Sequence, residues 1–491
     1  MSLDPRTPVL VGAGAASQRN DDPTGSVEAV ELMISALEAA AADAGPAALL
    51  GAARRIAVPE GTWGYADPGR LIGGRFGATD ATTVLADVGI LQQDVVADAC
   101  SRIAAGEIEV ALVAGGEARH RAVRAKVTGA TAPETVQPDR TAPDHRWTAP
   151  SLGVHDLEIV RNAVTPATSF ALIEHARMHH HGHSMGEHRR SLGELGESFA
   201  AVAGRNPQAW DRHRHTAEEV LTATPENRVI SSPYTKLMCS QWNVDQAAGL
   251  ILCSVAAAER FGVARDRWVF PLSSTVSNHA VPVLQRAELH RSPGSEVAAA
   301  RVCELAGVDG DGIAHVDLYS CFPSAVQALA GALGLAPGRE LTVTGGMALA
   351  GGPLNNYVLQ ALVVLVGALR DDPAAVGLST SVSGFLAKQG FGIWSATPSV
   401  AFCHEDVSAA AMAADAPARE VDAGFVGPAE VASWTVEHRS GVPFRAVVVC
   451  DTPSGARTLA STGDAATCAA MLDGDWTGTA VGVRHDGSFT L

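Results

Sequence analysis

Basic residues are scarce in this sequence, and the shortage limits the partners that the chain can have. Lys and Arg together number 36, against 53 Asp and Glu, which gives a formal net charge of −17. An acidic chain disfavours non-specific binding to nucleic acid or to an anionic membrane, because both carry negative charge. We therefore expect no nucleic-acid partner and no membrane partner, although a local basic patch could still hold an anionic small molecule.

Closely spaced cysteines are missing as well. The sequence has eight cysteines, and no two of them form a CxxC pair. Disulfide frameworks and structural zinc sites both show closer, patterned spacing. We therefore expect reduced thiols in a cytoplasmic protein.

The sequence also lacks a long hydrophobic run. The longest apolar stretch, Val358 to Leu369, is too short to cross a bilayer and is typical of a buried helix. The N-terminus, Met1 to Arg6, lacks the charged and then apolar layout of a signal peptide. These absences predict a soluble intracellular protein.

Apolar residues are nevertheless abundant enough for two or three folded domains. Hydrophobic residues make up 47% of the 491 residues, and there are 49 Gly and 26 Pro. This is a globular composition with many turns.

Strand and helix patterns alternate in two long stretches. The first begins with an apolar strand at 8–14 and includes a helix at 94–105 followed by a strand at 109–116. The second begins at Trp268 and includes helices at 295–306 and 355–369. Such alternation indicates mostly parallel sheets that are covered by helices on both faces. We therefore predict an α/β fold with a duplicated α-β-α layered core.

Two other regions have a different texture. Residues from about 120 to 240 contain prolines and a His-rich run, which predicts an inserted loop domain. The C-terminal part has short alternating strands separated by turn residues, which predicts a small all-β, barrel-like domain. The predicted boundaries are 1–265 for the N-terminal half, 266–404 for the C-terminal half and 420–491 for the additional β domain.

Three segments resemble the thiolase superfamily. Residues 103–117 (IAAGEIEVALVAGGE) resemble the helix, turn and strand that end in the AGG(M/V)E motif of thiolases. Residues 345–353 (GGMALAGGP) resemble the GGAIALGHP segment. Residues 315–322 (HVDLYSCF) resemble the strand that carries NEAF, or HDCF in the sterol-carrier-protein thiolase branch. The resemblance covers residues 8–402 and implies a thiolase-type layered core.

One branch of that superfamily is more similar than the others. The run 351–357 (GGPLNNY), the YSCFP run and the extra C-terminal domain resemble the type-1 thiolase-like proteins. Members of this branch are commonly labelled acetyl-CoA acetyltransferases by homology. The resemblance therefore implies a setting in lipid or acyl-CoA metabolism.

The residues that catalyse the thiolase reaction are replaced in this chain. A thiolase uses a nucleophilic cysteine, an activating histidine, a second cysteine for acid/base chemistry and an asparagine that holds a water at the thioester oxygen. By the resemblance, these positions are occupied by Gly89, Gly352, Val382 and Tyr319, respectively. The implied catalytic set is therefore not intact, and thiolytic or Claisen activity is not expected.

Several residues near these positions could still form a site. Cys321 precedes a helix that Pro323 is expected to open, where the helix dipole could favour a thiolate nucleophile. Alternatively, Cys321 is a small apolar filler. The asparagines at 355 and 356 could bind a carbonyl or an amide, or could simply cap a helix. The candidate pocket comprises Tyr319, Ser320, Cys321, Gly352, Asn355, Asn356 and Tyr357.

The His-rich run allows two interpretations. His175, His179 and His183 recur every four residues, a spacing that could bind a metal. Gly182 interrupts the helix there and no HExxH order is present, so we expect no metal. In thiolases the inserted region contacts coenzyme A (CoA). The resemblance thus implies that a patch of His179, His183, Arg189 and Arg190 faces the CoA phosphates.

Two functions follow from this sequence. The first is a non-thiolytic protein that binds CoA or acyl-CoA as a ligand, with no other cofactor, and acts as a monomer or a homodimer. The alternative is an acyltransferase similar to acetyl-CoA acetyltransferase that uses relocated residues such as Cys321. Whether the chain is an enzyme is left open by the sequence.

Overall fold

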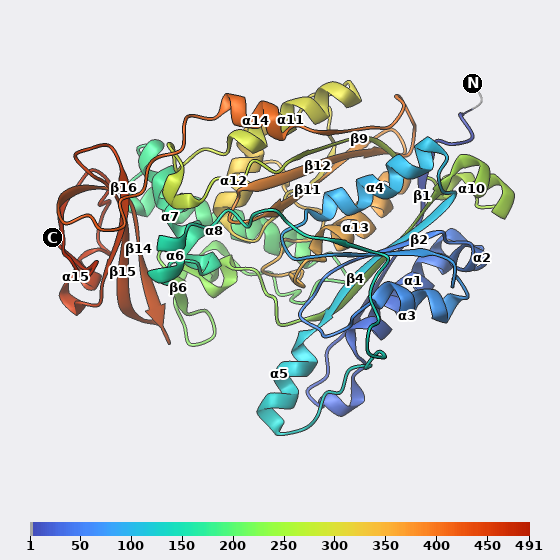
Figure 1. The fold of residues 1–491 in the computed structure, drawn as a ribbon, viewed down its shortest axis with the longest axis horizontal. Helices are drawn as coiled ribbons and strands as arrows, with labels where there is room; N and C mark the ends of the chain where they lie inside the picture. Colours follow the sequence, from blue (N-terminus) through green and yellow to red (C-terminus); the bar gives the residue numbers. More distant parts are fainter. Residues whose placement is uncertain (1–2) are drawn as a thin grey trace.

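The computed structural model describes residues 3–491 as an elongated molecule with three β-sheets (Figure 1). Met1 and Ser2, which begin the N-terminal segment considered above, lie outside the described residues. Within residues 3–491, no helix is both long enough and apolar enough to span a bilayer.

The first sheet belongs to the N-terminal half. Its strand order is β1-β8-β4-β2-β3-β5. The strands are β1 (Pro8–Gln18), β2 (Arg55–Pro59), β3 (Thr82–Ala86), β4 (Val110–Ala118), β5 (His145–Trp147) and β8 (Asp245–Ser254).

The second sheet belongs to the C-terminal half, with the order β10-β11-β12-β9-β13. Its strands are β9 (Phe270–Ser277), β10 (His315–Asp317), β11 (Val376–Ser383), β12 (Lys388–Ser395) and β13 (Cys403–Asp406).

The pairing directions confirm that the core is duplicated. Along β1-β8-β4-β2 the neighbours pair antiparallel, antiparallel and parallel, and β9-β12-β11-β10 repeats the same pattern. The sheets are mixed, but most strands run in one direction, as expected: only β8 in the first sheet and β12 in the second run against the others. A strand that is buried on both faces reads as a continuous apolar run in either direction, so the sequence did not reveal that β8 and β12 run antiparallel to their neighbours. The two halves join where Leu10 and Val269 exchange backbone hydrogen bonds of 2.8 and 3.0 Å.

Helices form layers on and between the two sheets. Helix α1 (Ala29–Ala44) covers sheet 1, and α11 (Pro293–Ala306) covers sheet 2. Between the sheets lie α4 (Gln92–Ala105) and α13 (Tyr357–Asp371), which contact strands of both. The apolar run predicted as a buried helix is α13, and its Val358, Leu362 and Leu369 are fully buried.

The remaining core helices are short and connect the strands. They are α2 (Ala48–Gly51), α3 (Pro68–Phe76), α10 (Val255–Phe261), α12 (Pro323–Ala332) and α14 (Ser408–Ala414), with 3₁₀ turns η1 (Pro23–Gly25), η3 (Arg265–Arg267) and η4 (Val283–Gln285).

The inserted region between β4 and β8 is mainly helical. It contains α5 (Arg119–Thr128), α6 (Asp156–Val160), α7 (Pro166–His180), α8 (Met185–Ala203), α9 (Ala217–Leu221), the short strands β6 (Val229–Ser231) and β7 (Tyr234–Thr235), and the turn η2 (Lys236–Met238). Figure 1 shows α5 extending away from the core, whereas α7 and α8 lie toward the C-terminal sheet.

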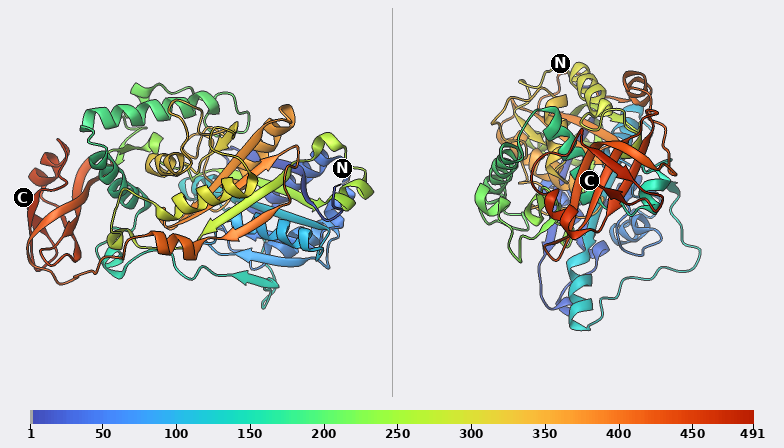
Figure 2. Two further views of the ribbon diagram at one scale, coloured as in Figure 1. Left: turned by 90° about the horizontal axis from the view of Figure 1, so that it is seen from above. Right: turned by 90° about the vertical axis from the view of Figure 1, so that its left-hand side faces the viewer.

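The C-terminal sheet lies at one end of the long axis (Figure 2). It contains β14 (Gly427–Arg439), β15 (Val442–Asp451), β16 (Arg457–Thr462), β17 (Ala480–Val483) and β18 (Phe489–Thr490), with helix α15 (Ala465–Ala470) beside β15. The outer strands approach each other, and the Ser461 N–H donates to the Gly487 carbonyl at 3.1 Å, as the barrel-like prediction anticipated. Strand β6 of the inserted region joins the same sheet through the Glu437–Ser231 pair, which the sequence did not predict.

Candidate functional site

The four family positions lie on loops and strand ends between the two sheets. Gly89 lies between β3 and α4, Tyr319 follows β10, Gly352 precedes α13 and Val382 is near the end of β11. Because α4 and α13 lie side by side between the sheets, their N-terminal loops meet. The Asn355 Nδ2 is 3.5 Å from the Ala86 carbonyl, which links the loops of the two halves.

Gly89 has neither the backbone conformation nor the space for a side chain. Its φ is +108°, which side chains of L-residues rarely tolerate. A Cβ atom there would lie 2.6 Å from the Leu152 Cδ2 and 2.9 Å from the Ala149 Cβ. The buried Lys388 also donates from Nζ to the Gly89 carbonyl at 3.0 Å. The segment from 149 to 152 therefore covers the position at which a nucleophile would stand.

The position of the family histidine is similarly occupied. A Cβ atom on Gly352 would lie 2.1 Å from the Ser240 Oγ and 3.1 Å from the Met347 Cε. The Gly352 N–H donates to the Gln241 carbonyl at 2.9 Å, so the backbone is fixed close to this segment. An imidazole would have to displace both Ser240 and Met347.

Apolar and aromatic side chains fill the space between these positions. Met347, Tyr357 and Ala361 form a small buried cluster, against which Tyr319 and Cys321 pack. The Tyr319 and Tyr357 rings meet edge to face at 5.9 Å between centroids. The same cluster includes three members of the sequence-derived candidate pocket, so the structure brings these residues together as a packed core.

Cys321 is held as a thiol in this cluster. Burial raises the pKa of the Cys321 thiol above its ordinary value, and this effect outweighs the backbone hydrogen bonds that would lower it. Its carbonyl accepts from the Ser240 N–H at 3.1 Å, which holds the 240 segment against the start of α12. The expected helix at Pro323 is present, but desolvation of the sulfur opposes the dipole effect.

The two asparagines differ in their surroundings. Asn355 adopts a left-handed conformation with φ of +56°, whereas Asn356 is the N-cap residue of α13 without a side-chain capping bond. Both amide atoms of Asn356 are buried and lack a hydrogen-bond partner in the described structure. The cap is supplied instead by Gln92 of α4, whose Oε1 accepts from the Val358 N–H at 2.8 Å.

A buried polar network continues from Tyr357. Its hydroxyl lies 2.7 Å from the Thr344 Oγ1 and 3.3 Å from the Ser320 Oγ. The Asp317 Oδ2 accepts from Thr344 through both its N–H and its hydroxyl, at 3.2 and 3.0 Å. Burial raises the pKa of Asp317 despite these bonds. The Thr342 and Thr344 hydroxyls, which both contact Asp317, accept from the N–H groups of Gly345 and Gly346 and so hold this glycine turn in place. The sequence did not predict this role of Asp317.

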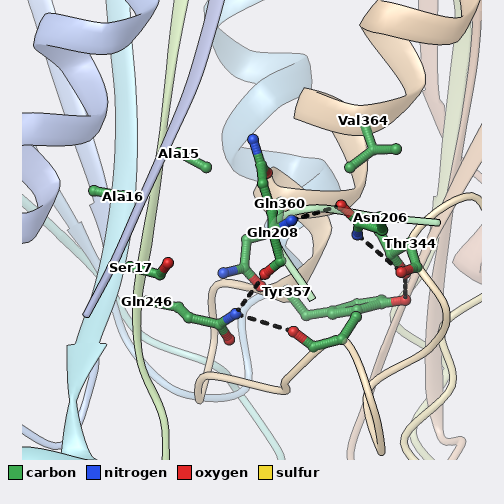
Figure 3. A pocket seen from close by; sticks show the side chains of 11 residues that line it. Ala15, Ala16, Ser17, Asn206, Gln208, Gln246, Thr344, Tyr357, Gln360 and Val364 are labelled. Carbon is green, nitrogen blue, oxygen red and sulfur yellow. Dashed lines mark hydrogen bonds between the residues drawn. The ribbon is translucent and has the colours of Figure 1, made fainter. Parts of the chain in front are cut away.

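A small polar cavity adjoins this network (Figure 3). Its volume of about 40 Å³ suits a few water molecules. The Gln246 Nε2 donates to the carbonyls of Gln208 and Ala350 at 3.2 and 3.0 Å, while its Oε1 is buried without a partner in the part of the chain that the structure describes. The lining includes Asn206, Gln208, Gln246, Thr344, Tyr357 and Gln360.

A separate apolar groove has Ser320 among its lining residues. It runs between α8, η2 and the start of α12, and about 30 Å³ of it is open. Its walls include Leu192, Phe199, Leu237, Phe322, Val326 and Leu349.

The four residues expected to face the CoA phosphates have different surroundings in the structure. The His179 Nδ1 lies 2.6 Å from the Asp475 Oδ2 of the C-terminal domain. Arg189 donates to the Leu221 carbonyl at 3.1 Å. His183 and Arg190 are exposed. The fully buried His175 stacks on Trp434 with ring centroids 3.9 Å apart, whereas the His179 side chain is 51% exposed.

The comparisons with known proteins agree with this geometry. A family model described as the thiolase-like protein type 1 additional C-terminal domain matches residues 410–488. No functionally curated protein matches the sequence significantly. The solved structure of a monomeric SCP2-thiolase-like protein type 1 from Mycobacterium smegmatis is 27% identical with a TM-score of 0.84, and the match covers 99% of both chains.

Thiolases match over a smaller share of this chain. Human mitochondrial 3-ketoacyl-CoA thiolase, solved in complex with CoA, is 17% identical with a TM-score of 0.57, and the match covers 80% of this chain and 98% of that one. The dimeric peroxisomal thiolase of Saccharomyces cerevisiae is 13% identical with a TM-score of 0.57, over 80% of this chain and 98% of that one. These two matches show the fold alone. The full-length match and the C-terminal domain model make this chain similar over its whole length to the type-1 thiolase-like proteins of the thiolase superfamily.

Proposed function

We propose that this protein binds CoA or an acyl-CoA without cleaving it or forming a carbon–carbon bond. The observation that carries the proposal is the packing around Gly89 and Gly352, which leaves no space for a nucleophile or a base on an otherwise thiolase-like core. The reaction needs both groups, because the acyl chain must be transferred to an activated sulfur.

The apolar groove is the proposed place for the ligand chain. Its walls include Leu, Phe and Val side chains and also Ser320, whose Oγ lies 3.3 Å from the Tyr357 hydroxyl of the buried cluster. Only about 30 Å³ is open, so we expect binding to widen the groove by a shift of α8 or η2. The human thiolase of the same fold was solved in complex with CoA, which supports CoA as the ligand class. A setting in lipid metabolism is part of the proposal.

The proposal also covers the oligomeric state of the protein and its cellular compartment. The Mycobacterium smegmatis relative is described as monomeric, which supports a monomer here. All eight cysteines carry free thiols, which supports a reducing compartment such as the cytoplasm.

Acyl transfer through Cys321 is the second candidate, and one experiment separates the two. The protein is mixed with short, medium and steroid-like acyl-CoAs, and native and denaturing mass spectra are recorded. A mass increase in the native spectrum alone supports binding. A mass increase that survives denaturation contradicts it and favours an acyl-enzyme, which peptide mapping would assign to Cys321 or to another residue.

A matched pair of variants tests the location. Ala348→Phe adds a ring to the half-buried groove wall, whereas Ala410→Phe adds the same ring on the exposed face of α14. We expect Ala348→Phe to abolish the native mass increase and Ala410→Phe to retain it. Absence of any shift with every CoA compound would overturn the proposed function.

A further inference from the structure

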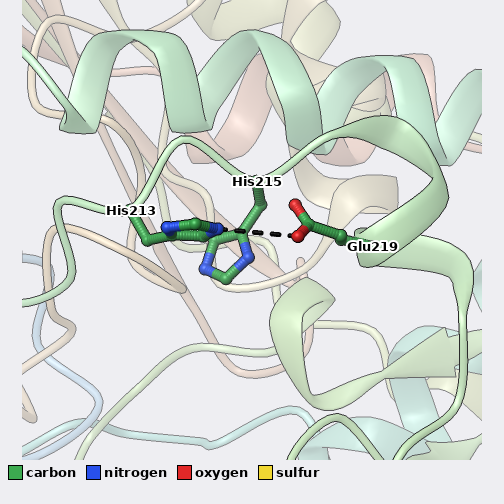
Figure 4. Close-up of side chains that lie close together, drawn as sticks. All are labelled: His213, His215 and Glu219. Carbon is green, nitrogen blue, oxygen red and sulfur yellow. Dashed lines mark ion pairs between the residues drawn. The ribbon is translucent and has the colours of Figure 1, made fainter.

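A cluster of potential metal ligands lies outside the thiolase-like positions, on the loop between α8 and α9 and in α9 itself. His213, His215 and Glu219 each offer one ligand atom, and these atoms lie within 4.8 Å of one another. Figure 4 shows the carboxylate of Glu219 facing the two imidazole rings. The His213 Nε2 and the Glu219 Oε1 are 3.6 Å apart.

These distances suit a transition-metal ion. With metal–ligand bonds of about 2.1 Å, two ligand atoms of a tetrahedral site lie roughly 3.4 Å apart. The His213–Glu219 separation is close to this value, and the third ligand atom needs only a side-chain adjustment. Two imidazoles and one carboxylate form the donor set that catalytic zinc sites use, which leaves a fourth position open.

A second observation is the support given to His215. The His215 Nε2 lies 3.1 Å from the Asp211 Oδ2, and this ring is the most buried of the three ligands. If Nε2 donates to Asp211, the Nδ1 of His215 keeps its lone pair for a metal. A carboxylate that accepts from the second ring nitrogen is the usual support of a metal-bound histidine, because it fixes the orientation and tautomer of the ring.

The surroundings provide access and negative charge. The cluster lies in a surface hollow of about 510 Å³, whose walls also carry Glu218 and Glu226. The His213 side chain is 61% exposed and that of Glu219 50%, so an ion can enter from solvent. The Glu219 Oε2 accepts from the Thr216 N–H at 2.8 Å in a capping box, which fixes the carboxylate while Oε1 remains directed at His213.

We propose that His213, His215 and Glu219 bind one divalent transition-metal ion, with Zn²⁺ the best fit to two nitrogen ligands and one oxygen ligand. Asp211 is the residue that orients His215. The open position of the metal faces the hollow, where water or an anionic oxygen of a ligand can occupy it. The hollow shares Leu237 with the apolar groove, so the ion would lie next to the proposed acyl-CoA site without being part of it.

The test uses the full chain with any polyhistidine tag removed and residual metal stripped by a chelator. Zn²⁺ alone is titrated by calorimetry, and Co²⁺ is added separately so that its absorption spectrum reports the coordination geometry. We expect one ion per chain and a tetrahedral or five-coordinate Co²⁺ spectrum. No measurable binding, or a spectrum of hydrated Co²⁺, would overturn the proposal.

Three variants localise the ion. His213→Gln removes an exposed ligand and should weaken Zn²⁺ binding at least about 10-fold. Glu219→Gln retains an acceptor for the capping box and should weaken binding similarly, which separates ligand loss from misfolding. The control is His183→Gln, an exposed histidine in the other His-rich segment. Loss of binding in His183→Gln, or unchanged binding in His213→Gln, would contradict the proposed site.

Discussion

Gln92 and Val358 form one of the hydrogen bonds that join the two halves of the core: the Gln92 Oε1 accepts from the Val358 N–H at 2.8 Å. Gln92 begins α4 of the first half, and Val358 lies in the first turn of α13 of the second half. A helix normally receives such a bond from its own N-cap residue. Here the Asn356 side chain is buried against Gly115 instead, where the Asn356 Oδ1 would lie 2.6 Å from an added Cβ.

Replacement of Gln92 should therefore destabilise the whole core. We expect Gln92→Ala to lower the free energy of unfolding by about 1–3 kcal/mol, because the buried Val358 N–H loses its acceptor. Urea unfolding measures the change. Gln360→Ala is the control, because Gln360 lines the polar cavity on the same helix and has no side-chain hydrogen bond in the described structure. Equal effects of the two substitutions would contradict this role for Gln92.

Restoring the family residues should not restore thiolase activity. Gly89→Cys and Gly352→His each place a side chain into occupied space, and overpacking of this kind costs about 1–3 kcal/mol. We expect lower melting temperatures and no thiolysis of acetoacetyl-CoA by either variant or by the pair.

Gly367→Ala provides the stability control for these glycine variants. Nothing lies within 4 Å of a Cβ added at this exposed position of α13. Because alanine favours a helix over glycine, we expect a stabilisation of up to about 1 kcal/mol. A Gly352→His protein as stable as the wild type would contradict the expected cost of overpacking, because it would show that Ser240 and Met347 move aside at little cost in free energy.

Cys321 should react slowly with alkylating agents. Burial raises the pKa of this thiol, so a smaller share of it is thiolate at pH 8 than in a free cysteine. We expect Cys321 to be labelled by iodoacetamide at least about 10-fold more slowly than N-acetylcysteine, because the thiolate is the reactive form and the sulfur is enclosed. Peptide mapping over time gives the rate. Labelling faster than that of N-acetylcysteine would favour a nucleophilic role.

His175 should make the fold sensitive to acid. Its enclosure against Trp434 lowers the pKa of His175 to about 4, compared with about 6.5 in an unfolded chain. As the pH falls from 6.5 to 4, the unfolded chain takes up a proton that the folded protein does not, so stability falls by up to about 3 kcal/mol.

The comparison with His175→Gln isolates this contribution. Glutamine can still donate to the Trp434 carbonyl, the partner of the His175 Nδ1 at 2.7 Å, but it does not titrate. We expect the variant to lose less stability than the wild type between pH 6.5 and pH 4 in urea titrations. His290, whose pKa is also lowered to about 4, contributes to both proteins and cancels in the difference. Parallel pH profiles would show that His175 does not carry the effect.

The sequence predicted those features that depend on local patterns or on family motifs. The apolar run of α13 and the duplicated α/β core are examples. The space around Gly89 could not be predicted, because Leu152 and Ala149 reach it from a loop about sixty residues further along the chain. The Gln92 cap has the same origin, since its partner is 266 residues away in sequence.

The proposed metal ligands were missed for a different reason. The pattern His-x-His followed by Glu four residues later is present at 213–219. The run at 179–183 has more histidines and is therefore the stronger metal-binding signal in the sequence. In that run His179 pairs with Asp475, and the nearby His175 is buried against Trp434. The convergence of His213, His215 and Glu219 depends on the turn before α9, which the Thr216–Glu219 capping box holds.

Strand β6 has a consequence for how such a protein can arise and be re-engineered. Ser231 of the inserted region pairs with Glu437 of the C-terminal sheet, and the hydroxyls of Ser231 and Thr435 lie 2.8 Å apart. The tail is thus completed by chain contributed from the middle of the sequence. A gene fusion that moves only the tail onto another thiolase core would leave this sheet edge and the Trp434 face without their counterparts. We therefore expect a transplanted tail to fold stably only when the insertion is transplanted with it.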